Sequence, residues 1–339
     1  MPLILFPGQG IPWTSSVRPF LHLPAVQNTL KHAEQVLSIS ILNVITDDGC
    51  SRTASQLPTS IVQPSVLACS VALYRAHVLS LRELPEKHSL FLGHSLGEYA
   101  ALVASKALSF EDALRVVDVR GRAMHECAKR YADTGMLCLT LLSRNQKAIG
   151  AFHATLQQIL ETQNASVSIP EARVVVANLN SPLQIVFSGR KTALQAFSGK
   201  AIETIQSTRT GSIWRGSRVR STMLDVEGAF HSPFMEPTEE PLYRALQTVQ
   251  WNLSQTDKDS HKLRVLCNVT GDFHEANPNI LSQRLVQHCT QPVQFQRCFD
   301  TARSVLGPDA TAFDNGPATV ASSLARQNGW TLESERNES

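Results

Sequence analysis

The chain has 339 residues, 42% of them hydrophobic and 18% charged, which is typical of a folded globular enzyme and excludes an intrinsically disordered chain. The formal net charge of +2 gives nucleic acid no overall attraction, so a charged partner would need a local patch. No run of about 18 apolar residues occurs, which excludes a membrane-spanning helix.

Strand-like apolar runs alternate with amphipathic helical runs through the first third of the chain. This alternation predicts an α/β fold with a parallel central sheet. We expect strands over residues 3–6, before a Pro-Gly-Gln-Gly turn, and over residues 89–92. Helices are expected over residues 61–79 and from a cap at Ser109 to about Tyr131.

The pattern changes at Gly135. The order strand, helix, strand, strand, helix is expected over residues 136–142, 146–161, 173–177, 184–188 and 192–205. This order predicts an inserted ferredoxin-like subdomain at 135–221, within an α/β-hydrolase-like large subdomain made of 1–134 and 222–339. The basic stretch 209–220 is expected to be a loop, and later strands are expected at 265–269 and 311–313, with a last helix after Gly316-Pro317.

Residues 93–97 read Gly-His-Ser-Leu-Gly, directly after an apolar run and before a helix-prone stretch. This is the Gly-x-Ser-x-Gly pattern of a nucleophile elbow, a tight strand-to-helix turn that exposes a serine hydroxyl. Ser95 at the helix N-terminus would benefit from free N–H groups that stabilise developing negative charge. We therefore predict that Ser95 is a nucleophile.

A serine hydroxyl needs a base within hydrogen-bond reach. Of the eleven histidines, His231 stands out because it lies in a stiff loop ended by Pro233, where the chain leaves the expected insertion. Arg120 has two interpretations: a guanidinium that binds a carboxylate through two parallel hydrogen bonds, or a surface ion pair with the nearby Asp118.

Eight motifs occur together in one order. They are Phe6-Pro7-Gly8-Gln9-Gly10, Gln63-Pro64-Ser65-Val66, Gly93-His94-Ser95-Leu96-Gly97-Glu98-Tyr99, Arg120-Gly121-Arg122-Ala123-Met124, Asn178-Leu179-Asn180-Ser181-Pro182, Phe230-His231-Ser232-Pro233-Phe234-Met235, Pro292-Val293-Gln294-Phe295 and Asn315-Gly316-Pro317. With them the chain resembles the malonyl-CoA:acyl-carrier-protein transacylases, and in detail their fungal mitochondrial type, from Leu3 to about Gly329.

The resemblance implies roles for individual residues. Ser95 would carry the malonyl group as an ester, and His231 would act as general base and then as acid. The backbone N–H groups of Gln9 and Leu96 would form the oxyanion hole, and Arg120 would bind the malonyl carboxylate.

Further residues take supporting roles by the same resemblance. The backbone carbonyl of His288, where bacterial relatives commonly carry glutamine, would orient His231. Phe230 matches the malonyl-selective pattern, and its bulk should exclude a methyl branch at C2. Gln63, Asn178 and Asn180 would support the site, the two asparagines by holding loops, and His94 would be a packing residue and not a second base.

The implied reaction moves malonyl from malonyl-CoA to the pantetheine thiol of acyl carrier protein by a ping-pong mechanism, in type II fatty-acid synthesis, with no cofactor and no metal. A basic patch is expected from Arg209, Arg215, Arg218 and Arg220. This patch would either bind the acidic carrier protein or be ordinary solvated surface. Neither nucleic acid nor a membrane span is expected.

Alternatives stay open at this point. A serine hydrolase or thioesterase would need an acid, and the best spare one, Asp314, follows His231 in the wrong chain order for that fold. A stand-alone acyltransferase of polyketide synthesis and a non-catalytic scaffold are the others. The resemblance indicates a mitochondrion, but the chain enters a strand at once without a usual presequence, so the cytosol is the alternative. Seven scattered cysteines without a Cys-x-x-Cys pair indicate reduced thiols.

Overall fold

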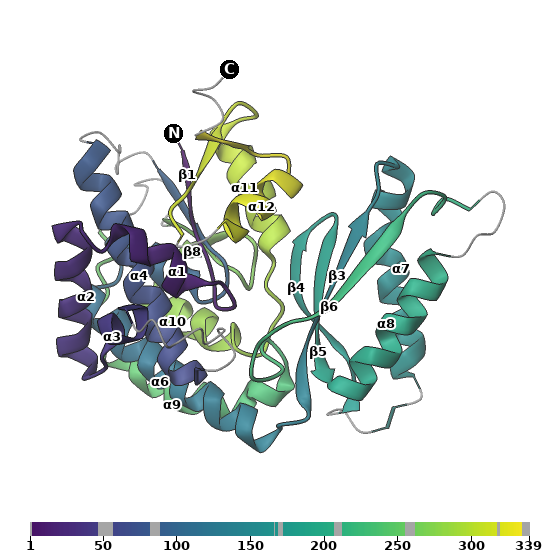
Figure 1. Cartoon of the computed structure of the whole chain (residues 1–339), viewed down its shortest axis with the longest axis horizontal. Helices are drawn as coiled ribbons and strands as arrows, with labels where there is room; N and C mark the ends of the chain where they lie inside the picture. The colour runs from purple at the N-terminus through teal and green to yellow at the C-terminus, as the bar shows by residue number, and fades with distance from the viewer. Residues whose placement is uncertain are drawn as a thin grey trace.

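Two β-sheets lie side by side in the computed structural model, each with helices packed against it (Figure 1). The structure describes residues 2–46, 57–81, 89–165, 167–168, 172–206, 212–254, 262–316 and 319–333. No helix within these ranges is both long and apolar enough to cross a membrane.

The larger sheet has six strands in the order β10-β9-β1-β2-β7-β8. Their bounds are β1 Leu3–Phe6, β2 Leu90–Gly93, β7 Lys262–Leu266, β8 Phe273–Glu275, β9 Thr311–Asp314 and β10 Thr331–Leu332. All neighbours pair in parallel except β8, which returns antiparallel to β7 at the edge. Every residue of β1 and β2 is buried, as expected for parallel strands covered on both faces. The predicted parallel sheet is confirmed.

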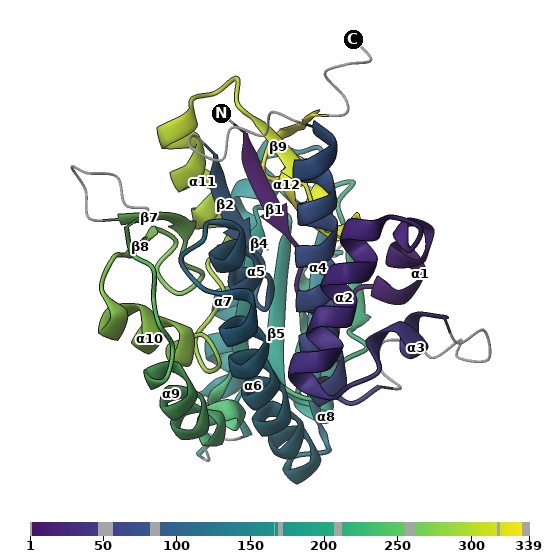
Figure 2. The ribbon, with the colours of Figure 1, turned by 90° about the vertical axis from the view of Figure 1, so that its left-hand side faces the viewer.

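Helices cover both faces of this sheet. Successive side chains of β1 point to opposite faces: Ile4 and Phe6 join one apolar core, and Leu3 and Leu5 join another. The first core lies under α2, α4, α5 and α6, and the second lies under α11 and α12 (Figure 2). The helices are α1 Trp13–Val17, α2 Pro24–Leu37, α3 Ile41–Thr46, α4 Thr59–Leu81, α5 Gly97–Ala104, α6 Phe110–Arg130, α9 Glu239–Gln247, α10 Pro278–Gln287, α11 Phe295–Leu306 and α12 Val320–Gln327, with 3₁₀ turns at Arg18–Phe20 and Pro233–Thr238.

The smaller sheet is antiparallel, with the order β4-β5-β3-β6. Its elements are β3 Thr134–Leu142, α7 Gln146–Asn164, β4 Val175–Ser181, β5 Gln184–Arg190, α8 Lys191–Ile205 and β6 Arg218–Met223. Both helices pack on one face, over Leu137, Leu139 and Leu141 of β3. This chain order and strand order are those of a ferredoxin-like module, so the predicted fold class is confirmed.

Some sequence-based boundaries were wrong. The end of the basic stretch expected to be a loop is a strand, because β6 begins at Arg218; Arg209 lies outside the described residues. The strand expected at 265–269 is β7 at Lys262–Leu266, and the strand expected at 173–177 is β4 at Val175–Ser181. The division into subdomains at 134/135 and 221/222 stays a prediction.

Candidate active site

Ser95 lies in the turn between β2 and α5, with a φ of 51° in the left-handed region. Two glycines allow this turn. A Cβ on Gly93 would lie 1.9 Å from the carbonyl carbon of Gly97, and a Cβ on Gly97 would lie 2.4 Å from the backbone oxygen of Phe6. No side chain fits at either position, so the strand end, the elbow and β1 close on one another. The predicted strand–turn–helix setting of Ser95 is therefore present.

His231 approaches Ser95 from the loop after β6. Its Nε2 lies 2.8 Å from Ser95 Oγ, and its Nδ1 lies 2.7 Å from the backbone oxygen of His288. Since a carbonyl can only accept, Nδ1 carries the proton and Nε2 is free to accept one from the serine. Ser188 of β5 donates to the backbone oxygen of Phe230 over 2.5 Å, which ties the smaller sheet to this loop. The geometry is that of a nucleophile–base pair oriented by a backbone carbonyl.

Burial keeps His231 neutral. Desolvation, reinforced by the positive charge of Arg120, lowers the pKa of His231 to about 3. Burial likewise lowers the pKa of His94, and it holds the pKa of His288 well below the ordinary value. At neutral pH, His231 can therefore take up a proton when the serine reacts.

Arg120 is 1% exposed, on α6. Its Nη1 donates to Gln63 Oε1 over 2.7 Å, whereas its Nε and Nη2 are buried without a hydrogen-bond partner among the described residues. Asp118 makes no contact with these donors; both of its carboxylate oxygens instead accept from Nε of Arg122. The surface ion pair that the sequence left open is thus excluded for Asp118. A buried guanidinium with two unused donors suits an anionic ligand.

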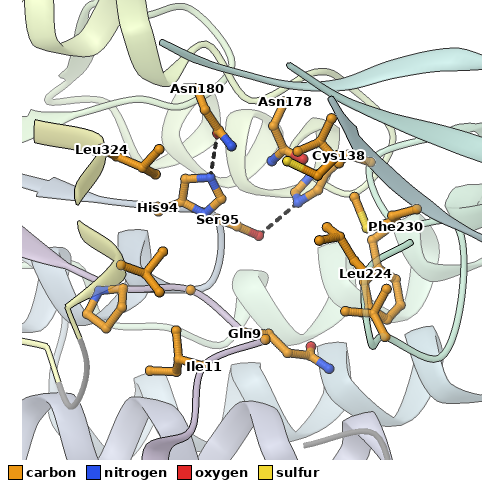
Figure 3. A pocket seen from close by; sticks show the side chains of 18 of the residues that line it. Gln9, Ile11, His94, Ser95, Cys138, Asn178, Asn180, Leu224, Phe230 and Leu324 are labelled. Atoms are coloured by element: carbon orange, nitrogen blue, oxygen red, sulfur yellow. Dashed lines mark hydrogen bonds between the residues drawn. The ribbon is translucent and has the colours of Figure 1, made fainter. Parts of the chain in front are cut away.

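Most of the predicted residues line one cavity of about 190 Å³ (Figure 3), whereas Leu96 and His288 are not among its lining residues. Its lining includes Gln9, Gln63, Ser95, Arg120, Asn178, Asn180, Phe230 and His231. No hydrogen bond between described residues uses the N–H of Gln9 or of Leu96. Two backbone donors are thus available beside the serine, as an oxyanion hole requires.

Asn178 and Asn180 lie on strand β4, and their role in holding loops stays a prediction. Strand β4 contacts residues outside the smaller sheet: the N–H of Leu179 donates to the backbone oxygen of Val293 over 2.9 Å, and the side-chain Oδ1 of Asn180 lies 2.8 Å from Nε2 of His94, the residue after β2. The His94 ring packs edge-on against Phe295, with centroids 4.7 Å apart. His94 thus has the packing and hydrogen-bonding environment expected for it.

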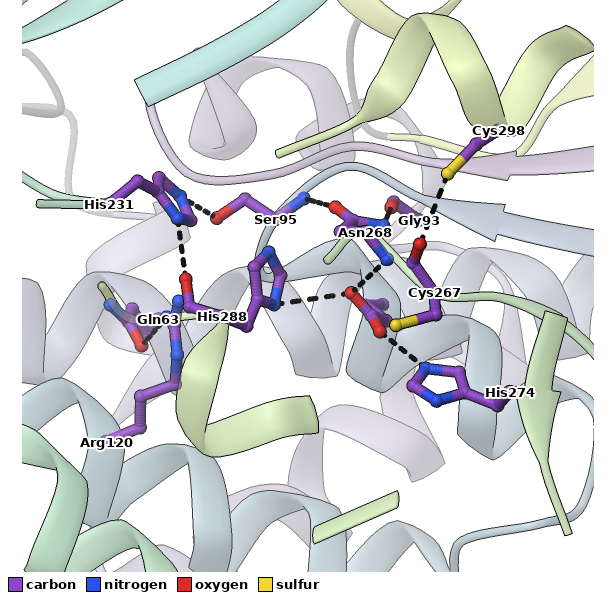
Figure 4. A network of polar contacts seen from close by, with 11 residues as sticks. Gln63, Gly93, Ser95, Arg120, His231, Cys267, Asn268, His274, His288 and Cys298 are labelled. Carbon is purple, nitrogen blue, oxygen red and sulfur yellow. Dashed lines mark hydrogen bonds and ion pairs between the residues drawn. The ribbon is translucent and has the colours of Figure 1, made fainter. Parts of the chain in front are cut away.

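A buried polar network behind Ser95 was missed by the sequence reasoning (Figure 4). Asn268 contacts the backbone on both sides of the elbow, and Glu98 of α5 accepts from the backbone of Asn268 and from His274. The visible signal was Glu98 inside the elbow motif; nothing in the sequence placed Asn268 and His274 beside it.

Glu98, Cys267 and His274 form the one metal-compatible cluster found among the described residues, with donor atoms within 4.8 Å of one another. Glu98 Oε1 and His274 Nε2 are only 2.5 Å apart and bond to each other. Ligands at about 2.0–2.1 Å in tetrahedral geometry would be farther apart, so this pair fits a hydrogen bond and not a shared zinc ion.

Asp314, the spare acid, is turned away from the base. Its carboxylate accepts from the backbone of Gly316 and from both the backbone and the hydroxyl of Ser322. It therefore caps the start of α12 instead of completing a triad.

The six cysteines of the described ranges are free thiols; Cys50 lies outside those ranges.

The acyl transferase domain family matches residues 4–305, and the chain belongs to this family. It is 37% identical to the mitochondrial malonyl CoA-acyl carrier protein transacylase of Schizosaccharomyces pombe, over 98% of this chain and 99% of that protein. The chain is 28% identical to the malonyl CoA-acyl carrier protein transacylase of Bacillus subtilis, over 95% of this chain and 89% of that protein. The crystal structure of an acyl-carrier-protein S-malonyltransferase from Bartonella henselae matches with a TM-score of 0.74 and 26% sequence identity. The match covers 97% of this chain and 92% of that chain.

Proposed function

We propose that this acyltransferase moves a malonyl group from malonyl-CoA to acyl carrier protein for fatty-acid synthesis. The observation that carries the proposal is that Ser95 with its base and the unpaired edge of Arg120 line one cavity. An alcohol next to a neutral imidazole can form an ester, and a guanidinium with free donors can hold the carboxylate of that ester. The relatives are named for the same transfer.

The first half-reaction forms the ester. Ser95 Oγ attacks the thioester carbon while His231 Nε2 takes its proton, and the oxyanion is stabilised by the N–H groups of Gln9 and Leu96. The carbon–sulfur bond then breaks, and His231 returns the proton to the CoA thiolate. Losing one oxyanion donor typically costs about 3 kcal/mol of transition-state stabilisation.

The second half-reaction reverses these roles. His231 takes the proton of the pantetheine thiol, the sulfur attacks the malonyl ester, and Ser95 Oγ leaves with the proton returned by His231. The carrier thus receives malonyl as a thioester, and the enzyme returns to its starting state. Each half-reaction uses the same serine, base and oxyanion hole, so ping-pong kinetics follow.

The smaller sheet offers a surface for an acidic carrier. Arg220 pairs across β6–β3 with Thr140, and Arg218 pairs with Leu142, so both point to the same face as Cys138, which lines the cavity. Two residues along a strand span about 7 Å, which places Arg220 close to the cavity. Arg215 is also exposed. These three arginines support the proposed patch, to which Arg209 contributes only as a sequence-based expectation.

Intact-mass analysis after mixing with malonyl-CoA tests the proposal. We expect a malonyl adduct on the wild type and none on Ser95→Ala. With holo-carrier present, transfer to the carrier should exceed release of free malonate. Faster release to water would favour the hydrolase or thioesterase alternative, and absence of any adduct on a folded wild type would favour a scaffold.

The cellular site of this reaction is a separate proposal. The Schizosaccharomyces pombe relative is named mitochondrial, and a similar Drosophila melanogaster protein is named as probable mitochondrial. We infer a mitochondrial location for this chain, and subcellular fractionation of its native cells tests it. Recovery in the cytosol alone would overturn the inference.

A further inference from the structure

Asn268 lies in the turn after β7, fully buried, and its side chain bridges the backbone on both sides of the elbow. Asn268 Oδ1 accepts from the N–H of Ser95 over 2.7 Å, and Asn268 Nδ2 donates to the oxygen of Gly93 over 2.8 Å. Gly93 ends β2, and Ser95 precedes α5. One amide therefore holds both the last residue of the strand and the residue that opens the turn (Figure 4).

This bridge acts on a backbone that would not hold its conformation by itself. Ser95 is one of only a few non-glycine residues with positive φ among those described, and such a conformation persists when its surroundings fix it. The direction of Ser95 Oγ and that of the adjacent Leu96 N–H both depend on the same turn. A small rotation at Ser95 would move the nucleophile and the oxyanion donor together.

We propose that Asn268 is a positioning residue for the transfer reaction: it fixes the elbow so that Ser95 Oγ and the N–H of Leu96 face the reacting carbonyl at the same time. The inference rests on the proposed function only for its substrate, because the bridge itself is independent of which acyl group is bound.

Asn268 is itself held from behind. Its N–H donates to Glu98 Oε2 over 3.3 Å, and His274 Nε2 lies 2.5 Å from Glu98 Oε1. Burial disfavours a charged imidazole, but Cys267 and Glu98 outweigh it and raise the pKa of His274 to about 10. A buried ion pair thus anchors the acceptor for Asn268. Because Glu98 N also donates to the oxygen of Ser95 over 3.0 Å, Glu98 and Asn268 restrain the same turn.

The test compares Asn268→Ala with Asn277→Ala. Like Asn268→Ala, the substitution Asn277→Ala removes two side-chain hydrogen bonds. The bonds of Asn277 cap the start of α10 and do not touch the elbow. We expect Asn268→Ala to lower kcat for malonyl transfer by about 10- to 100-fold with little change in KM, whereas Asn277→Ala lowers only the unfolding temperature. An equal kcat for the two variants would overturn the proposal.

Two further measurements separate positioning from a loss of folding or of the proposed function. Labelling of Ser95 by phenylmethylsulfonyl fluoride, which needs no malonyl-CoA, should slow in Asn268→Ala by a similar factor. In Asn268→Asp, a protonated carboxyl restores both the acceptor for Ser95 and the donor for Gly93, so its activity relative to wild type should rise as the pH falls. If Asn268→Ala does not fold, the Asn268→Asp variant decides: activity that stays far below wild type at every pH contradicts the proposal, and so does wild-type activity at high pH that falls as the pH drops. A wild type that is labelled by the sulfonyl fluoride but takes no malonyl would instead contradict the proposed function alone.

Discussion

Gln63 Oε1 accepts from Nη1 of Arg120 over 2.7 Å, while Nε and Nη2 of the same guanidinium have no partner among the described residues. Gln63 also donates from Nε2 to Gln9 Oε1 over 3.3 Å, and Gln9 Nε2 donates to Thr59 over 3.1 Å. The chain of amides fixes one edge of the guanidinium and leaves the other edge for a ligand. Pre-orientation of this kind reduces the entropy lost when the ligand binds.

Arg120→Gln should therefore lower kcat/KM for malonyl-CoA by at least about 100-fold, because two hydrogen bonds to a charged group are lost at about 1.5–3 kcal/mol each. Acetyl-CoA has no such carboxylate, so its kcat/KM should change little. The measurement is the ratio of the two constants. Arg122→Gln, two residues along α6 on its exposed face and paired with Asp118, is the matched control and should leave the ratio unchanged. A parallel fall for both substrates would contradict carboxylate recognition.

Phe230→Ser should admit methylmalonyl-CoA. Phe230 lines the cavity beside the base and is 5% exposed, so its removal opens space where a C2 methyl group would point. One methyl group is worth about 1–3 kcal/mol, so competition assays should show a 10- to 200-fold shift in preference. Phe230→Tyr keeps the volume and should keep malonyl selectivity. Unchanged selectivity of the serine variant would show that another wall excludes the branch.

The acid limb of kcat/KM should lie well below pH 6.5, since the pKa of His231 is lowered to about 3. A pH–rate profile with far-ultraviolet circular dichroism at each point measures it. The same shift affects stability: below pH 6.5 the unfolded state binds a proton that the native imidazole does not, so stability falls by about 1.4 kcal/mol per pH unit as the pH drops toward 3. An acid limb centred near pH 6.5, measured while the protein stays folded, would contradict a His231 whose pKa is lowered by burial.

The double reversal Arg218→Glu with Arg220→Glu should raise the KM for the carrier protein and spare formation of the malonyl-serine ester, because only the second half-reaction uses this surface. The effect should shrink with added salt. Lys147→Glu with Lys200→Glu changes the same charge on α7 and α8, over the opposite face of that sheet, and should leave this KM unaltered. A matching change in both half-reactions would indicate a structural role.

The sequence located the reacting groups better than their supports. The elbow pattern placed Ser95, and the motif order pointed to His231 and Arg120, because each of these lies in a locally distinctive segment. Strand β6 was missed because only Val219 among its residues is buried, so no alternating apolar signal exists. Asn268 was missed because its contacts are made with Ser95, 173 residues away in the sequence. Only the folded sheet brings these two residues together.

The chain enters and leaves the smaller sheet at neighbouring points, since Leu137 of β3 pairs with Met223 of β6 and Leu224 donates to the oxygen of Met136. Because the two junctions are adjacent, this segment can be replaced by the corresponding segment of a related enzyme. The replacement would join the rest of the chain at two neighbouring points without distorting it. The graft would replace the cavity wall that carries Cys138, Gln184 and Val186, while nucleophile and base both stay with the recipient. Chimeras cut at these junctions offer a direct route to redesigning acyl-group preference.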